Sequence, residues 1–361
     1  MLEPMNPIPD TISLYCRAAQ EYKASDLILD EGEPPVLRVS GSITPLDAPV
    51  ISSQDLSHFR TACGVPLTDD EYDASFETPE GVRFRVNFHH RVGGEGAVLR
   101  RISTTPPPME SLGVPSEALC EMVQRRSGII IVSGPTGSGK STTLASLLDW
   151  VNHHLERHVV TIEDPVEFIF KRDKSLFTQR AVGLDTGGFA EGLRGALRQA
   201  PDIILVGEIR DSETASVALQ AAETGHLVLA SLHSSDVGEV LERLEAFFPE
   251  GERKGLLQIL AGQLQMILCQ KLVPSTDGGR ILVSEHLINA GMARQCILHG
   301  DVAGLRDYLL KADESESVDF LRSFHRLVSE GRIAMETAMQ ACPNPAELRR
   351  RLRGISSGFR S

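Results

Sequence analysis

The chain lacks the features that mark a secreted, membrane-spanning or zinc-binding protein. It has six cysteines and none of them forms a C-x-x-C pair: Cys16, Cys63, Cys120, Cys269, Cys296 and Cys342. This scatter argues against a zinc ribbon or a disulfide framework and is typical of a reducing cytosol. No stretch approaches the ~18 apolar residues of a membrane span, and no signal-peptide pattern opens the chain. These absences predict a soluble cytoplasmic protein, which could still dock on membrane-bound machinery.

The chain also has little positive charge. Its 361 residues include 36 basic and 49 acidic ones, which gives a formal net charge of −13. Such a balance argues against a general nucleic-acid binder, because nothing would neutralise a long phosphate backbone, although a local basic patch remains allowed. A length of 361 residues predicts about two domains, with cores of substantial size.

The first part of the chain predicts a small α+β domain over residues 1–103. The clearest strand is 82–88, where apolar residues alternate with Arg83, Arg85 and Asn87, the period of a strand with one buried face. Asp10 is the expected N-cap of the first helix. The other expected elements are helices at 11–22 and 53–63 and strands at 27–29, 36–39 and 97–102.

The prolines at 106–108 predict a linker, because three in a row fit neither a helix interior nor a central strand. We place this linker at 104–118, an α/β core at 119–290 and a helical C-terminal region at 291–361. Unbroken β-branched runs in the core predict a parallel sheet covered on both faces. Its expected strands are 129–132, 158–162, 203–206 and 227–232, and its expected helices are 141–155, 189–197 and 213–223. Beyond residue 236 the pattern predicts mostly helix, apart from 281–283.

A phosphate-binding loop of the G-x-x-x-x-G-K-[ST] type follows the first core strand. Its glycines let backbone N–H groups converge on phosphate oxygens, and the helix that follows adds its dipole. Lys140 is expected to reach the β- and γ-phosphates, and the Ser141 hydroxyl to complete a magnesium shell. The predicted nucleotide-binding residues are Gly134, Pro135, Thr136, Gly137, Ser138, Gly139, Lys140, Ser141 and Thr142.

Two further strand ends carry acids that suit phosphoryl transfer. Glu163 and Asp164 follow the strand 158–162, where they are expected to hold metal or orient water; the alternative is a turn or capping role. The strand 203–206 resembles a Walker B strand, although Gly207 stands where the magnesium aspartate is usual. Glu208 is therefore the candidate general base. Glu163 and Asp164 are expected to supply the missing part of the metal shell.

Histidines and arginines complete the candidate set. His233 follows the strand 227–232 and is expected to contact the γ-phosphate, whereas His226 at its other end is expected to be structural. Arg83, Arg85 and Arg100 cluster on one predicted hairpin. Each alone would be an ordinary surface residue, but together they are a credible arginine finger for a neighbouring subunit.

These motifs together resemble the secretion-type ATPase superfamily, most closely the type IV pilus retraction ATPases of the PilT/PilU kind. The matching segments are the phosphate loop, the acidic box 161–168, the Walker B end 207–211, the histidine box 222–233 and the arginine strand 83–87. The first four of these segments follow one another in this order along the chain. The resemblance covers roughly residues 10 to 300, and this order makes it specific.

The resemblance implies a PAS-like N-terminal domain joined to a RecA-like core, assembled as a homo-hexameric ring. ATP with Mg²⁺ would lie between the core of one subunit and the N-terminal domain of its neighbour. Hydrolysis would then move an inner-membrane platform protein, with the enzyme peripheral at that membrane, and power pilus retraction in twitching motility.

Three alternatives stay open. The family's C-terminal motif should fall near 291–298, where only Arg294 and the apolar positions resemble it. This departure allows an accessory, weakly hydrolysing partner of a paralogous retraction ATPase. A pilus or secretion assembly ATPase is less expected, because its four-cysteine module is missing after the core. A nucleic-acid translocase is disfavoured by the acidic balance.

Overall fold

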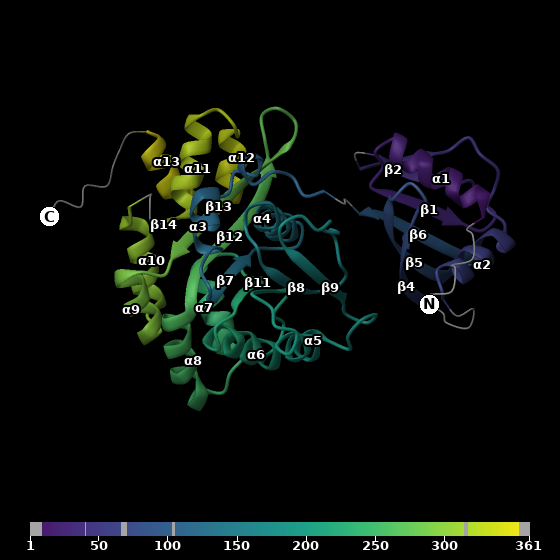
Figure 1. Cartoon of the computed structure of the whole chain (residues 1–361). Helices are drawn as coiled ribbons and strands as arrows, with labels where there is room; N and C mark the ends of the chain where they lie inside the picture. Colours follow the sequence, from purple (N-terminus) through teal and green to yellow (C-terminus); the bar gives the residue numbers. More distant parts are fainter. Residues whose placement is uncertain (1–8, 40, 66–70, 103–104, 314–316, 354–361) are drawn as a thin grey trace. The chain divides into compact units, whose positions relative to one another are not determined.

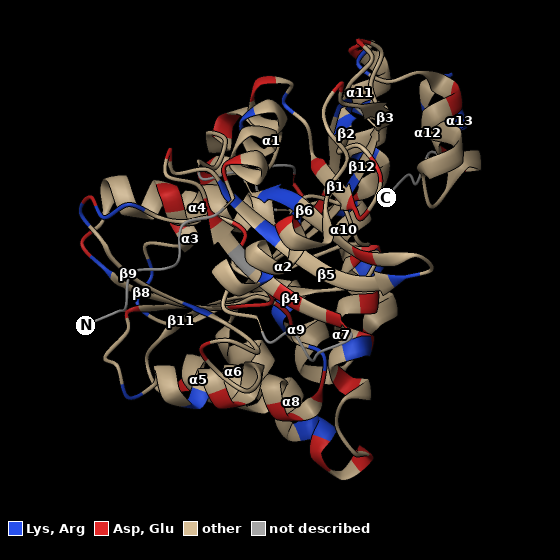
Figure 2. Cartoon of the chain, turned by 90° about the vertical axis from the view of Figure 1, so that its right-hand side faces the viewer, with Lys and Arg blue, Asp and Glu red and all other residues tan. Residues whose placement is uncertain are grey.

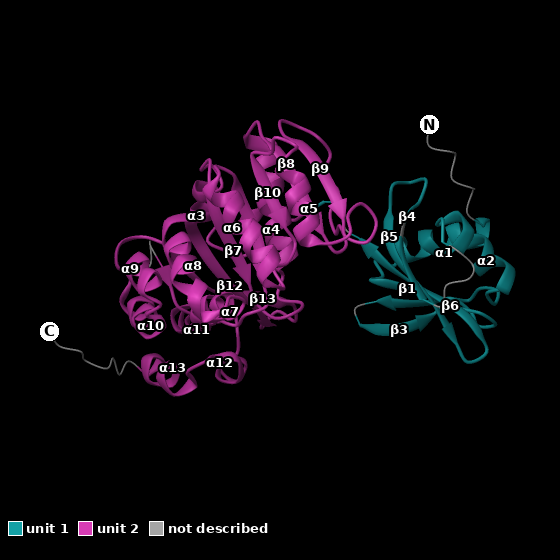
Figure 3. Cartoon of the chain, turned by 90° about the horizontal axis from the view of Figure 1, so that it is seen from below, with its two compact units in different colours: residues 1–105 teal, residues 106–361 magenta. Residues whose placement is uncertain are grey.

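The computed structural model describes residues 9–39, 41–65, 71–102, 105–313 and 317–353. The chain divides into two compact units, Met1–Thr105 and Pro106–Ser361, which Figure 3 colours separately. Each unit has its own hydrophobic core and is described by itself.

The first unit is an antiparallel sheet with two helices, α1 (Asp10–Glu21) and α2 (Ser53–Ala62). The strand order is β3-β2-β1-β6-β5-β4 (Figure 1). The alternation predicted for β5 is present, because Phe84, Val86 and Phe88 are buried in one core with residues of both helices. The strand bounds are β1 Asp26–Asp30, β2 Val36–Val39, β3 Ser42–Pro45, β4 Glu71–Glu77, β5 Arg83–Arg91 and β6 Gly94–Ile102.

Two expectations for this unit differ from the structure. Asp10 is the first residue of α1 and Pro9 takes the N-cap position, with no side-chain capping hydrogen bond, so the predicted cap was wrong. An acid in the first turn still favours the helix through its dipole. The edge strand β4 was not expected, because its sequence mixes acids with apolar residues.

The second unit contains a sheet in the order β14-β13-β12-β7-β11-β10-β8-β9. Along the sheet, the strands from β12 through β9 are parallel to their neighbours. Strand β13 pairs antiparallel with β12, and β14 pairs antiparallel with β13. The α/β fold class predicted from the sequence is confirmed. The bounds are β7 Gly128–Ser133, β8 His158–Glu163, β9 Leu176–Ala181, β10 Ile203–Val206, β11 Leu227–Leu232, β12 Leu264–Pro274, β13 Arg280–Ile288 and β14 Ser317–Val318.

Helices cover both faces of this sheet. In β7, Ile129 and Ile131 pack with α5 to α8, while Ile130 and Val132 face the opposite core with α3 and α4. A strand buried on both sides gives the unbroken apolar run seen in the sequence. The helices are η1 Met109–Ser111, α3 Ser116–Met122, α4 Lys140–His154, α5 Phe189–Ala196, α6 Ser212–Glu223, α7 Val237–Ala246, α8 Glu250–Gln263, α9 Gly291–His299, α10 Val302–Lys311, α11 Phe320–Ser329, α12 Met335–Ala341 and α13 Pro345–Leu352.

Two segments of the second unit depart from the sequence prediction. Residues 264–274 were expected to be helical, yet β12 pairs with β7 and forms a long antiparallel ladder with β13. A short apolar run does not by itself distinguish a buried strand from a buried helix. Residues 106–118 were expected in the linker, but Met109 and Val114 are buried with Leu119 in the core that α4 covers. The folded part of this unit therefore includes this segment.

Charged residues of both signs are interspersed on the ribbon, for example along α8 in the view of Figure 2. Within the described ranges, no helix is both long and apolar enough to cross a bilayer.

Replacing a side chain at the centre of the second sheet should cost much of its stability. Leu229 of β11 is fully buried, so Leu229→Ala should lower the free energy of unfolding by about 2–5 kcal/mol. Leu176→Ala is the control, because Leu176 is 46% exposed and its loss should cost under ~0.5 kcal/mol. Urea unfolding followed by circular dichroism measures both. Equal losses in the two variants would contradict the core described here.

Candidate nucleotide-binding site

The phosphate loop connects β7 to α4 through backbone conformations that require glycine. Gly134, Gly137 and Gly139 have φ values of 149°, 77° and 92°. A Cβ at Gly134 would lie 2.4 Å from the Gln270 carbonyl oxygen and 2.6 Å from Ser138 Oγ, so no larger residue fits. Gly139 is the N-cap of α4, which begins at Lys140. The loop thus presents its backbone N–H groups at a helix N-terminus, the arrangement that binds phosphate.

Lys140 is held inside this loop. Its ammonium donates to the Gly134 carbonyl oxygen at 2.8 Å and to that of Pro135 at 3.2 Å, and the residue is buried. Burial lowers the pKa of Lys140, while the nearby carboxylates of Glu208 and Glu167 act to raise it. A bound phosphate would take the place of the two carbonyl acceptors as the partner of this cation.

The register of the parallel strands brings three further strand ends to the loop. Val206 pairs with Ile162 on one side and with Ala230 on the other, so β8, β10 and β11 end at the same edge as β7. Their following residues line a cavity of about 350 Å³ together with the phosphate loop. The predicted site residues that meet there are Thr136, Gly137, Lys140, Ser141, Glu163, Asp164, Glu208 and His233.

Both oxygens of the Glu208 carboxylate have a partner in this cavity. Its Oε1 lies 3.2 Å from His233 Nε2, and its Oε2 accepts from Arg210 Nε at 2.8 Å. Arg210 also donates to Asp164 at 3.3 Å and lies over the Phe189 ring at 5.5 Å from its centroid. The hydrogen bond that Arg210 donates to Glu208 raises the pKa of Arg210, so this guanidinium stays charged. Glu208 is therefore oriented by two side chains that follow β10 and β11.

Glu163 has a different environment, although it lines the same cavity. Its carboxylate accepts from Thr161 Oγ1 at 2.7 Å, and burial raises its pKa to about 7. Without a cation beside it, Glu163 is thus partly protonated at neutral pH. Proton release on cation binding is the ordinary behaviour of such a buried acid.

The glycine in the Walker B position has a steric reason. A Cβ at Gly207 would lie 3.1 Å from the Ile162 carbonyl oxygen and 3.2 Å from Glu163 Cα. Ser231 Oγ also donates to the Gly207 carbonyl oxygen at 2.5 Å. A Cβ at this position would be in tight contact with the end of β8, and the acids at the end of β8 line the cavity.

The donors present fit a magnesium ion that is shared with a nucleotide. Ser141, Glu163 and Asp164 offer hard oxygen atoms at the cavity. Among the described residues, no group of three or more His, Cys, Asp or Glu side chains forms a metal cage. Mg²⁺ commonly takes one or two carboxylates and completes its shell with phosphate oxygens and water. A site of this kind is therefore one that the nucleotide completes.

A second cavity, of about 380 Å³, lies against other atoms of the phosphate loop. Gly139 and Thr142 line it, together with Ser138, whose hydroxyl is buried and has no hydrogen-bond partner in the described structure. Residues after β12, such as Asp277, and Arg280 of β13 complete its wall. The phosphate loop thus contributes to two cavities.

The three candidate finger arginines lie in the first unit. Arg85 and Arg100 are direct partners across β5 and β6, and Arg83 lies two residues from Arg85 on the same strand face. Arg85 pairs with Asp73 at 2.8 Å, and Arg100 pairs with Asp26 at 2.8 Å. Any role in another subunit would require these guanidinium groups to exchange or share those carboxylates.

Sequence reasoning missed Arg210 and Glu167, which both line the cavity. Arg210 stands two residues after Glu208, beyond the end of β10, where no periodicity predicts its direction. His226 behaves as expected of a structural residue, because its ring contacts the Ala221 carbonyl oxygen at 3.1 Å and Thr224 Oγ1 at 3.3 Å.

Comparisons with known proteins agree with this geometry. The sequence pattern of the family described as "Type II/IV secretion system protein" matches residues 68–301. The Type IV pilus retractation ATPase PilT of Pseudomonas aeruginosa is 38% identical over 332 residues, which cover 89% of this chain and 95% of the relative. The Type IV pilus ATPase PilU of the same organism is 35% identical, over 92% of this chain and 89% of the relative.

A solved structure is similar over nearly the whole chain. It is a crystal structure of the pilus retraction motor PilT with bound ADP, with a TM-score of 0.87 and 37% identity, covering 94% of this chain and 99% of that one. The resemblance inferred from the motifs is confirmed, and the chain belongs to the Type II/IV secretion system protein family.

Proposed function

We propose that this chain is an ATP-hydrolysing motor that powers type IV pilus retraction. The observation that carries the proposal is one cavity lined by Lys140 and Ser141 of the phosphate loop and by Glu208 and His233. The relatives named as a retraction ATPase and as a retraction motor with bound ADP supply the biological setting. Family resemblance favours a homo-hexamer that acts on an inner-membrane pilus platform protein from the cytoplasmic side.

Each group has a role in this proposal. Lys140 and the loop amides bind the phosphates, and Glu208 accepts a proton from the attacking water. His233 contacts the γ-phosphate. Magnesium, bound by Ser141 with Glu163 or Asp164, would neutralise charge that develops on the phosphate oxygens. Arg83, Arg85 or Arg100 acts from the next subunit.

A second candidate is an accessory ring partner that hydrolyses ATP weakly beside a paralogous retraction ATPase. The segment 291–298, which departs from the family's C-terminal motif, forms most of α9, where Arg294 is exposed and Ala293 and Ile297 are buried. The similarity to PilU also favours this candidate. The intact set of Lys140, Glu208 and His233 favours the motor.

Deletion of the gene tests the function in cells. We expect hyperpiliated cells without twitching, restored by the wild-type gene but not by Lys140→Ala, because the phosphates lose their cation. Electron microscopy of surface pili and a subsurface twitching assay are the measurements. Cells without pili would indicate an assembly ATPase, and restoration by Lys140→Ala would indicate the accessory role.

Arg210 should act on turnover through Glu208, not on nucleotide binding. Arg210→Gln should lower kcat by ~10–100-fold and leave KM within ~3-fold, because the base loses one of two orienting partners. Arg210→Lys should recover part of the loss, since it keeps the charge but not the two-pronged geometry. Steady-state phosphate release measures these values. A rise in KM with kcat unchanged would place Arg210 in binding instead.

The environment of Glu163 predicts a pH dependence of stability. Its pKa is about 7 when folded and ordinarily 4.5, so the folded protein binds the extra proton and its stability falls as pH rises between these values. Glu163→Gln removes this loss and keeps an acceptor for Thr161. At pH 8 the nucleotide-free variant should be more stable than wild type by on the order of 1–3 kcal/mol, with little difference at pH 4.5. Urea unfolding at both pH values measures this difference in the free energy of unfolding. An equal difference between variant and wild type at pH 8 and pH 4.5 would contradict the raised pKa of Glu163.

A further inference from the structure

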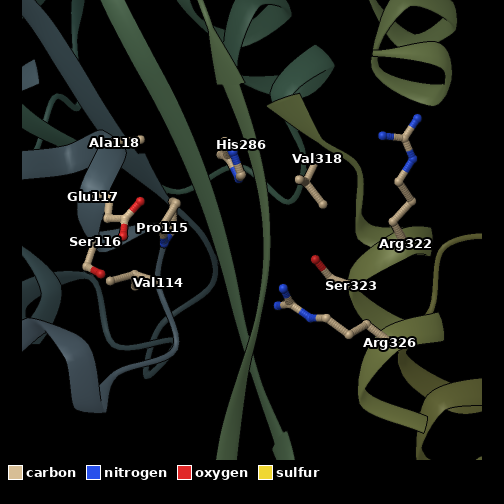
Figure 4. A pocket seen from close by; sticks show the side chains of 10 residues that line it. All are labelled: Val114, Pro115, Ser116, Glu117, Ala118, His286, Val318, Arg322, Ser323 and Arg326. Atoms are coloured by element: carbon tan, nitrogen blue, oxygen red, sulfur yellow. The ribbon is translucent and has the colours of Figure 1, made fainter. Parts of the chain in front are cut away.

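A cavity of about 420 Å³ in the second unit has no role in the nucleotide site. It lies between the start of α3, the strand β13 and the helix α11 (Figure 4). Its size is that of a small-molecule site. Its polar lining residues come from these elements: Ser116, Glu117, His286, Arg322, Ser323 and Arg326.

The histidine on β13 is buried and available at the same time. His286 is 7% exposed, and its ring has no hydrogen-bond or ion-pair partner in the described parts of the chain. Burial, and secondarily the charge of Arg326, lower its pKa to about 4. At neutral pH the ring is therefore uncharged and has one N–H donor and one acceptor. Its ring nitrogens are not enclosed by protein atoms, so a ligand in the cavity can reach them.

The two arginines of α11 differ in how they are used. Arg322 donates to the carbonyl oxygens of Ala312 at 2.6 Å and Leu310 at 2.8 Å, and its guanidinium points away from the cavity (Figure 4). Arg326 has no such side-chain partner in the described structure, and its guanidinium is directed toward β13. Arg322 therefore ties α11 to the preceding segment, whereas Arg326 is the cation available to a ligand.

Glu117 adds an acceptor on the opposite wall. Figure 4 shows its carboxylate on the α3 side of the cavity, across β13 from Arg326, and no ion pair joins the two in the described residues. A simple anion would be repelled by this carboxylate. An anion that carries its own O–H group would instead donate to it, while its charged oxygens meet the arginine.

We propose that this cavity binds the hydrogen phosphate ion, with its charged oxygens on Arg326 and the His286 N–H and its hydroxyl on Glu117. Sulfate has the same shape and charge but no hydroxyl, so it leaves Glu117 unpaired beside an anion. Glu117 and Arg326 are both exposed, so solvent weakens the penalty, but a site that accepts a hydrogen bond from a ligand hydroxyl still prefers that ligand to the analogue that lacks it. The cavity should therefore distinguish phosphate from sulfate.

Arg326 also lines the cavity that contains Gly139 and Thr142 of the phosphate loop. Arg326 thus borders both the proposed phosphate site and the second cavity at the phosphate loop. A ligand that holds Arg326 on the α3 side would change the charge available to that second cavity.

The test compares phosphate with sulfate on the ADP-loaded full chain, so that the phosphate loop is already filled. At pH 7 and matched ionic strength, phosphate at about ten times its Kd should raise Tm by about 2–4 °C more than sulfate. Both anions stabilise proteins non-specifically to a similar degree, so the difference reports the site. Equal shifts for the two anions in the wild type would overturn the proposal.

Variants locate the site. Arg326→Gln should lose the excess Tm shift that phosphate gives over sulfate. In Glu117→Gln, the Tm shift with sulfate should rise to that with phosphate. The matched control Arg126→Gln removes an exposed arginine of the same unit and should keep the excess. Lys140→Ala, measured without nucleotide, should keep it as well. The proposal is refuted if the excess Tm shift with phosphate survives in Arg326→Gln. It is also refuted if this excess disappears in Lys140→Ala, because either result would place the phosphate elsewhere.

Discussion

The parallel register of β7, β11, β10 and β8 is the constraint on which the site depends. Because these strands run parallel and in register, their C-terminal ends face the same edge of the sheet, and four loops that are far apart in the sequence meet there. The close approach of β8 to β10 is possible because Gly207 has no side chain. The loop after β7 can turn under Gln270 of β12 for the same reason, since Gly134 has none. The absence of a Cβ at these two positions thus permits two close approaches of the backbone at this end of the sheet.

The charged groups of the cavity already have protein partners before a nucleotide arrives. Lys140 is bound to two carbonyl oxygens of its own loop, and Arg210 is bound to Glu208 and Asp164. A triphosphate therefore exchanges partners instead of meeting free cations, which limits the cost of burying these charges in its absence. Before a nucleotide binds, His233 and Arg210 hold the two oxygens of Glu208 and so give its carboxylate a defined orientation. Arg210 thus connects Glu208, the proposed base, to Asp164 at the same cavity.

The sequence predicts the chemistry of this site better than its contacts. The spacing of glycines and Lys140 identifies the loop because only one backbone path suits it, and acids after apolar runs identify the strand ends. Arg210 was missed because the direction of a side chain beyond a strand end depends on the neighbouring strand. The strand β12 was missed because an apolar run forms a strand or a helix depending on the elements that pack beside it. The proposed roles of Arg83, Arg85 and Arg100 depend on a neighbouring subunit, so the sequence of one chain does not predict their contacts.

The most direct measurement is of ATP binding and phosphate release on one preparation of Glu208→Gln. We expect the variant to bind ATP within a few-fold of the wild-type Kd, because Lys140 and the loop are intact, while single-turnover phosphate release falls by at least ~100-fold. Phosphate release at the wild-type rate would show that the base lies elsewhere. It would remove the functional meaning of the shared cavity.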